Sequence, residues 1–215
     1  MPRRHRRSRD EAAGRAAALR TLVLVAAGEA PPDGDPPFSP RELQLLSRPP
    51  EAWESQDVVD AIWRGEALGA LGWALSALEE LPDYDEPFDH VELARELDLA
   101  QPLELRPAVD LEEERESARL WHWRARTTLL QGDPTVQLPE RWASFDQLIA
   151  AAAMRGHEEG LLPAPRRGDF PAFGTTYRQL DEEQLALARS IATERHYALA
   201  WLCSDAAWDE TPTDT

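Results

Sequence analysis

The chain has 215 residues, of which 42% are hydrophobic and 29% are charged. It can therefore bury the core of one folded domain, and its composition excludes a disordered or fibrous protein. Its net charge of −17 at pH 7 disfavours DNA and anionic membranes as partners and favours a basic one.

Seven helices are expected from apolar residues that recur every three or four positions. They span 11–27, 39–46, 57–81, 89–99, 110–130, 144–155 and 181–203. Ser39 and Glu42 form the pattern of a capping box, in which each side chain bonds the other's backbone N–H. Residues 31–38 contain four prolines and a glycine, so we expect a surface loop there.

Three glycines, Gly65, Gly69 and Gly72, interrupt the helix expected over 57–81. A glycine inside a helix costs about 1 kcal/mol relative to alanine. Three of them in one helix indicate that a neighbouring helix approaches closely.

Together these signals predict a mainly α protein, a single-domain irregular helical bundle of about six to seven helices. A long loop rich in glycine and proline covers 156–176, and loops of this length are usually functional or mobile. We expect one helical domain over 11–215, with an acidic C-terminal tail at 204–215.

Positive charge is concentrated at the N-terminus, in Arg3, Arg4, Arg6, Arg7 and Arg9. Short charged ends are usually solvated. We therefore expect residues 1–10 to form a disordered tail, and RNA binding through these arginines is the less favoured alternative.

The cysteine content and the apolar runs indicate a cytoplasmic protein that does not enter a membrane. Cys203 is the single cysteine, so no internal disulfide can form. The apolar residues 19–27 follow arginines as in a secretory leader, but Arg20 interrupts them, and we expect no leader. No apolar run approaches the ~18 residues of a membrane helix.

Sequence motifs for phosphate loops, zinc knuckles, metalloproteases and serine hydrolases are absent from the chain. The five histidines share no spacing typical of metal ligands. We therefore expect no metal and no cofactor, and the catalytic residues, if the protein has any, stay unknown at this stage.

Two opposite charges lie on apolar faces of expected helices, Glu66 on 57–81 and Arg195 on 181–203. A buried charge needs a partner, so we expect Glu66 to pair with Arg195, with Arg124 as the alternative partner. A structural ion pair is favoured, and the alternative is a ligand-binding carboxylate in a cleft.

Other polar side chains accompany this pair in or beside apolar segments. His122 lies between Trp121 and Trp123, and His196 follows Arg195. Buried, hydrogen-bonded histidines and core tryptophans are favoured over acid–base groups and a ligand-stacking surface. The candidate buried polar cluster comprises Glu66, Arg124, Glu194, Arg195, His122 and His196.

Several short motifs resemble those of the bacterial "domain of unknown function 4272" family. They are residues 63–68, 73–75, 81–82, 105–107, 120–124, 194–202, 208–209 and 213–215. The resemblance covers roughly 15–215, and the arginine-rich start and residues 31–40 depart from the pattern. It implies a bacterial, cytoplasmic, helical domain with no assigned reaction, and makes Glu66, Arg124, Glu194 and Arg195 motif positions.

Two functions remain open. The favoured one is a non-enzymatic interaction protein whose acidic helical surface binds a protein partner or a second copy. The alternative is a small-molecule-binding protein or hydrolase, with a pocket between the Glu66 and Arg195 helices roofed by residues 156–176.

Overall fold

Seven α-helices make up most of residues 7–213, which are the residues described by the computed structural model. They are α1 (Arg9–Ala26), α2 (Pro40–Leu46), α3 (Ser55–Ala74), α4 (His90–Glu96), α5 (Ala108–Gln131), α6 (Phe145–Glu158) and α7 (Glu182–Leu202). A two-stranded antiparallel hairpin, β1 (Pro171–Ala172) and β2 (Thr175–Thr176), lies between α6 and α7. The mainly α fold expected from the sequence is confirmed.

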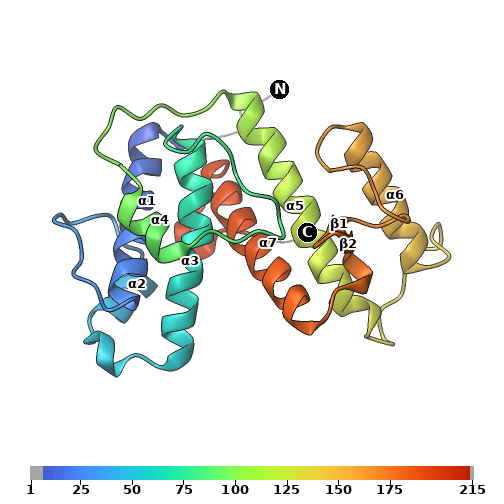
Figure 1. The fold of residues 1–215 in the computed structure, drawn as a ribbon, viewed down its shortest axis with the longest axis horizontal. Helices are drawn as coiled ribbons and strands as arrows, with labels where there is room; N and C mark the ends of the chain where they lie inside the picture. The colour runs from blue at the N-terminus through green and yellow to red at the C-terminus, as the bar shows by residue number, and fades with distance from the viewer. Residues whose placement is uncertain (1–6, 214–215) are drawn as a thin grey trace.

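The long helices lie in the order α1, α3, α7, α5 and α6, so neighbours in space are not neighbours in the chain (Figure 1). The short helix α4 packs on α1 and α3. One apolar cluster runs through α1, α3, α5 and α7, with Leu68 and Leu71 of α3 and Leu199 of α7 fully buried. None of the described helices has the length and apolar character to span a membrane.

Capping interactions set the beginnings of several helices. At α2, the Ser39 hydroxyl accepts a hydrogen bond from the Glu42 backbone N–H (3.3 Å). The Glu42 carboxylate in turn accepts a hydrogen bond from the Ser39 backbone N–H (2.8 Å). This is the capping box that the sequence predicts. The same carboxylate also pairs with the buried Arg15 of α1, which ties α2 to the core.

The glycines of α3 accommodate the segment that leads into α4. A Cβ atom at Gly69 would lie 2.2 Å from the Phe88 ring, and one at Gly65 would lie 2.4 Å from His90 Cβ. The close approach that we expected is therefore present, and it comes from the first residue of α4 and the loop before it.

Helix α3 ends at Ala74, well before the expected end at residue 81. Two groups of Arg106 bond carbonyls in the last turn: its side-chain Nε donates to Trp73 (2.7 Å) and its backbone N–H to Ala74 (2.9 Å). Ser76 then adopts a left-handed conformation at φ 58°. Residues 77–89 are therefore not part of the helix, and they cross the face of the bundle.

Both ends of the described chain pack against α7. The helix α1 begins at Arg9, inside the stretch expected to be disordered, and the Arg7 guanidinium lies 5.0 Å over the Trp201 ring. Arg3, Arg4 and Arg6 lie outside the described residues. Within the expected C-terminal tail, Trp208 is buried and makes an edge contact with Trp201 at 5.5 Å.

Candidate functional site

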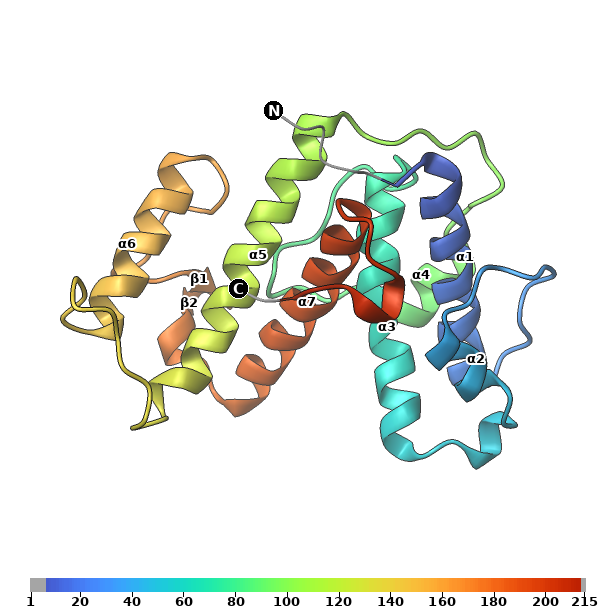
Figure 2. The same ribbon diagram turned by 180° about the vertical axis from the view of Figure 1, so that it is seen from behind.

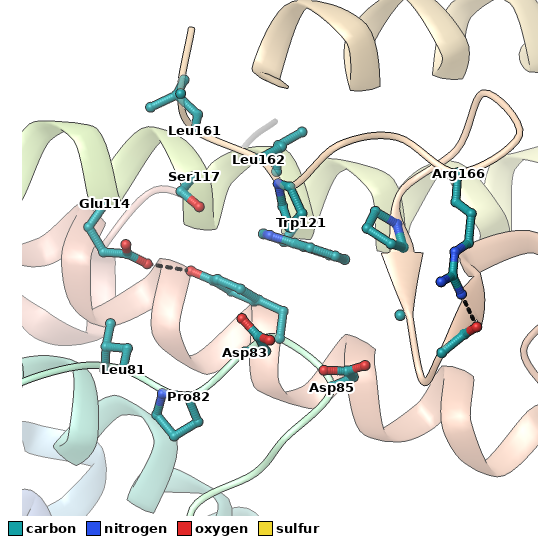
Figure 3. Close-up of a pocket in the computed structure, with 16 residues that line it drawn as sticks. Leu81, Pro82, Asp83, Asp85, Glu114, Ser117, Trp121, Leu161, Leu162 and Arg166 are labelled. Carbon is teal, nitrogen blue, oxygen red and sulfur yellow. Dashed lines mark hydrogen bonds between the residues drawn. The ribbon is translucent and has the colours of Figure 1, made fainter. Parts of the chain in front are cut away.

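A cavity of about 550 Å³ lies between three segments: the crossing loop 81–85, the first half of α5, and residues 160–174 (Figure 3). Helix α5 contributes Glu114, Ser117 and Trp121, which share one helix face because they are three and four residues apart. The Gly/Pro-rich segment, which we expected to roof a pocket, forms the opposite wall.

Glu114 and Tyr84 form the polar centre of this cavity. The Tyr84 hydroxyl donates a hydrogen bond to Glu114 Oε1 at 2.9 Å. The Tyr84 ring stacks on Trp121 (5.2 Å, 10°), and the Arg195 guanidinium lies 5.1 Å from the ring. Burial raises the pKa of the Glu114 carboxyl above its ordinary value, despite the opposing hydrogen bond from Tyr84.

Carboxyl groups outnumber basic groups around the cavity. Asp83 and Asp85 join Glu114 in the lining, and Arg166 is the basic side chain there. The Arg166 guanidinium donates to the Gly174 carbonyl, and Asp85 accepts from the Phe173 backbone N–H. The cavity is therefore acidic, with Ser117 as an additional hydroxyl donor and acceptor.

Glu66 and Arg195 form the buried ion pair that the sequence predicts. Arg195 Nε donates to Glu66 Oε2 at 2.8 Å, and both side chains are fully buried. Burial opposes ionisation of Glu66, but the hydrogen bond from His90 and the charge of Arg195 lower its pKa below the ordinary value. The pair is closed, and Glu66 does not line the cavity.

The same pair fixes the crossing loop that forms one wall of the cavity. The Arg195 guanidinium donates to the carbonyls of Pro82 (2.5 Å) and Glu86 (3.0 Å). Glu66 Oε1 accepts from the Phe88 backbone N–H at 2.8 Å. Glu66 and Arg195 are therefore positioning residues, and the pocket lies beside α5 rather than between their two helices.

Arg124 pairs with Asp169, so the alternative pairing of Arg124 with Glu66 is wrong. Arg124 Nε and Nη2 lie 2.7 and 2.9 Å from the two Asp169 oxygens in a fully buried, bidentate contact. Asp169 also accepts from the backbone N–H groups of Phe170 (2.8 Å) and Arg178 (3.0 Å). This second pair fixes the Gly/Pro-rich wall onto α5.

Glu194 lies apart from both pairs and bonds Arg64 of α3 at 2.9 Å. Burial raises the pKa of Glu194, while the charge of Arg64 opposes this effect. Neither residue lines the cavity at Glu114. The pair joins α3 to α7 and has a structural role.

His122 of α5 and His196 of α7 stack on each other, with ring centroids 4.9 Å apart and planes 26° apart. Burial lowers the pKa of His122 to about 4 and that of His196 to about 3. Both ring nitrogens of His196 are buried without a hydrogen-bond partner among the described residues, so the expectation of a hydrogen-bonded histidine is wrong at this position. The structure thus divides the expected cluster into three ion pairs and one imidazole stack.

Sequence reasoning missed Glu114, Tyr84 and Asp169. Glu114 lies in the acidic start of α5, where the helix dipole favours carboxylates. A carboxylate at such a position therefore does not by itself indicate a site. The available signal was the spacing of Glu114, Ser117 and Trp121 on one face. Asp169 lies in an irregular segment, where no periodicity marks a buried side.

Within residues 7–213, no three histidine, cysteine, aspartate or glutamate side chains gather in a group that could hold a metal ion. The carboxyl and hydroxyl groups that line the cavity can exchange protons, form hydrogen bonds and attract a cation.

Comparison with known proteins gives one family. The family model described as "Domain of unknown function (DUF4272)" matches residues 3–150. This range includes the arginine-rich start. Residues 194–215, which carry part of the resemblance, lie outside it. No curated protein and no solved structure gives a significant match.

Proposed function

Because the chain belongs to the DUF4272 family, whose description assigns no activity, we propose from its geometry that it binds a small molecule carrying a basic nitrogen in the Glu114 cavity. The observation that carries the proposal is a ligand-sized cavity whose polar centre is a half-buried carboxyl, Glu114, which accepts a hydrogen bond from Tyr84 and has a raised pKa.

The size of the cavity supports a small-molecule ligand. Ligand pockets commonly enclose about 300–1,000 Å³, and this one has about 550 Å³. Leu81, Leu162 and Pro163 provide apolar lining beside the polar groups. A ligand with a short apolar body and one polar end fits this combination.

The charges of the lining support a cationic group. A protonated amine near Glu114 would stabilise the ionised carboxylate and recover the energy that its burial costs. Ser117, one turn along α5, offers a further acceptor. The net charge of −17 also raises the local concentration of cations around the molecule.

Contacts within the protein hold the two irregular walls of the cavity in place, so their arrangement does not depend on a ligand. Arg195 bonds the carbonyls of the 81–86 loop, and Asp169 bonds backbone N–H groups of the opposite wall. Pre-organised walls reduce the entropy lost on binding. Binding is favoured over hydrolysis, because Ser117 makes no hydrogen bond to a histidine or carboxylate among the described residues.

A ligand-observed NMR screen tests this proposal. Short primary amines and the matching alcohols are mixed with the protein and with a Ser117→Phe variant, whose larger side chain fills the cavity. We expect some amines to bind the unchanged protein and to lose binding in the variant. Equal binding of the alcohols, or unchanged binding by the variant, would refute the proposal.

A second candidate function is supported by the charge of the molecule. A net charge of −17 favours contact with a basic protein partner, and the protein would then act in the cytoplasm as an interaction protein. The matching experiment is affinity purification at low salt. A basic protein released by added salt would support it, and a monomer that retains no protein would count against it.

A further inference from the structure

A second cavity, of about 770 Å³, lies between α5 and α6 and shares only Leu161 with the Glu114 cavity. Helix α6 stands at the edge of the molecule and packs against α5 (Figure 2). We call this cavity the α5–α6 groove.

The walls of the groove are mainly apolar. Leu120 and Trp123 of α5 line it together with Leu148 and Ala151 of α6 and with Trp142 of the connecting segment. Ala151 is exposed and the other four are half-buried. An apolar body of small-molecule size would cover this surface and remove it from water.

The charge of the groove is opposite to that of the molecule. Its two glutamates form salt bridges with arginines of the same groove: Glu116 with Arg119 at 2.7 Å, and Glu159 with Arg155 at 3.4 Å. A third arginine, Arg141, makes no ion pair among the described residues. Its guanidinium lies 5.7 Å from the Trp142 ring.

The neighbouring residue offers a second donor. The Trp142 indole Nε1 is buried and has no hydrogen-bond acceptor among the described residues. A buried donor without an acceptor is unfavourable, whereas an anionic acceptor would satisfy it and the adjacent Arg141 together.

From these observations we propose that the α5–α6 groove binds an organic anion, a carboxylate with an apolar body. The apolar body lies between Trp123 and α6, and the carboxylate lies beside Arg141 and Trp142. This site is independent of the amine site at Glu114, and its charge preference is the reverse.

The test compares two fluorescent probes, dansyl-labelled undecanoic acid and its methyl ester, which share the apolar body and differ in the charge of one end. Arg141→Gln removes the cation, and Ala151→Trp fills the groove from an exposed position. Arg48→Gln, which alters an exposed pair with Asp57 elsewhere, is the matched control.

We expect the acid to bind one site, about tenfold more weakly in Arg141→Gln because a charge-assisted hydrogen bond is lost. Ester binding should not change in that variant, and Ala151→Trp should weaken both probes. The proposal is overturned if Arg141→Gln leaves the acid unaffected or weakens both probes equally. It is also overturned if Ser117→Phe, in the other cavity, abolishes binding.

Discussion

Arg195 shows how one buried side chain can organise backbone from a distant part of the chain. Its guanidinium bonds Glu66 and three carbonyls of residues 82–86. Removing one partner of such a pair leaves an uncompensated buried charge, whereas replacing both with apolar groups is often tolerated.

We therefore predict that Arg195→Met lowers the free energy of unfolding by roughly 3–5 kcal/mol. The double variant with Glu66→Leu should lose less than the sum of the two single changes. Urea denaturation measures each value, and Arg48→Met at an exposed pair should change stability by less than about 1 kcal/mol. Additive losses in the double variant would show that the two residues act separately.

The stack of His122 on His196 predicts sensitivity to acid. Both histidines have folded-state pKa values, about 4 and about 3, below the ordinary 6.5. At these two histidines, the unfolded chain thus binds more protons than the folded one as the pH falls below 6.5. Each histidine then lowers the free energy of unfolding by up to about 1.4 kcal/mol per pH unit.

The variant His196→Phe should reduce this slope between pH 6.5 and 5 and leave the unfolding free energy at pH 7.5 unchanged or higher. The lowered pKa values of Glu66 and Asp169 act mainly below this window, so the histidines can be separated from them. Urea denaturation at several pH values measures the slope. Identical slopes in the variant and the unchanged protein would contradict this account.

At the scale of elements, the glycines of α3 allow neighbouring side chains to approach the helix closely. Gly69→Ala would place a methyl group against the Phe88 ring, where a Cβ atom would lie only 2.2 Å away. We predict a loss of about 1–3 kcal/mol by overpacking, despite the higher helix propensity of alanine. Thermal denaturation measures it.

Gly132→Ala is the control for this change, because its Cβ would meet only a carbonyl of its own helix at 3.6 Å. It should be nearly neutral. A stable Gly69→Ala protein would mean that residues 88–90 do not pack on α3 as described.

The helices were predictable because their apolar periodicity is local, whereas their ends depended on distant residues. Leu75, Leu78 and Leu81 continue the apolar pattern of α3, but contacts from Arg106 and the left-handed Ser76 end the helix at Ala74. Proline and glycine marked the irregular segments correctly. They carried no information about which side chains those segments bury.

At the scale of the whole molecule, the Glu66–Arg195 pair was predictable because both residues lie on apolar helix faces. The cavity was not, because it forms where two irregular walls and α5 meet. Glu114 resembles its acidic neighbours in the sequence, and tertiary packing alone separates it from them. Two buried arginine–carboxylate pairs provide that packing, one for each wall.

The most direct test of the account is an NMR titration of the Glu114 carboxyl carbon, with and without a saturating primary amine. We predict a pKa above the ordinary value of 4.5 without the amine and a lower pKa with it, because an ammonium group favours the carboxylate. A pKa at or below 4.5 that no amine changes would contradict the amine site at Glu114.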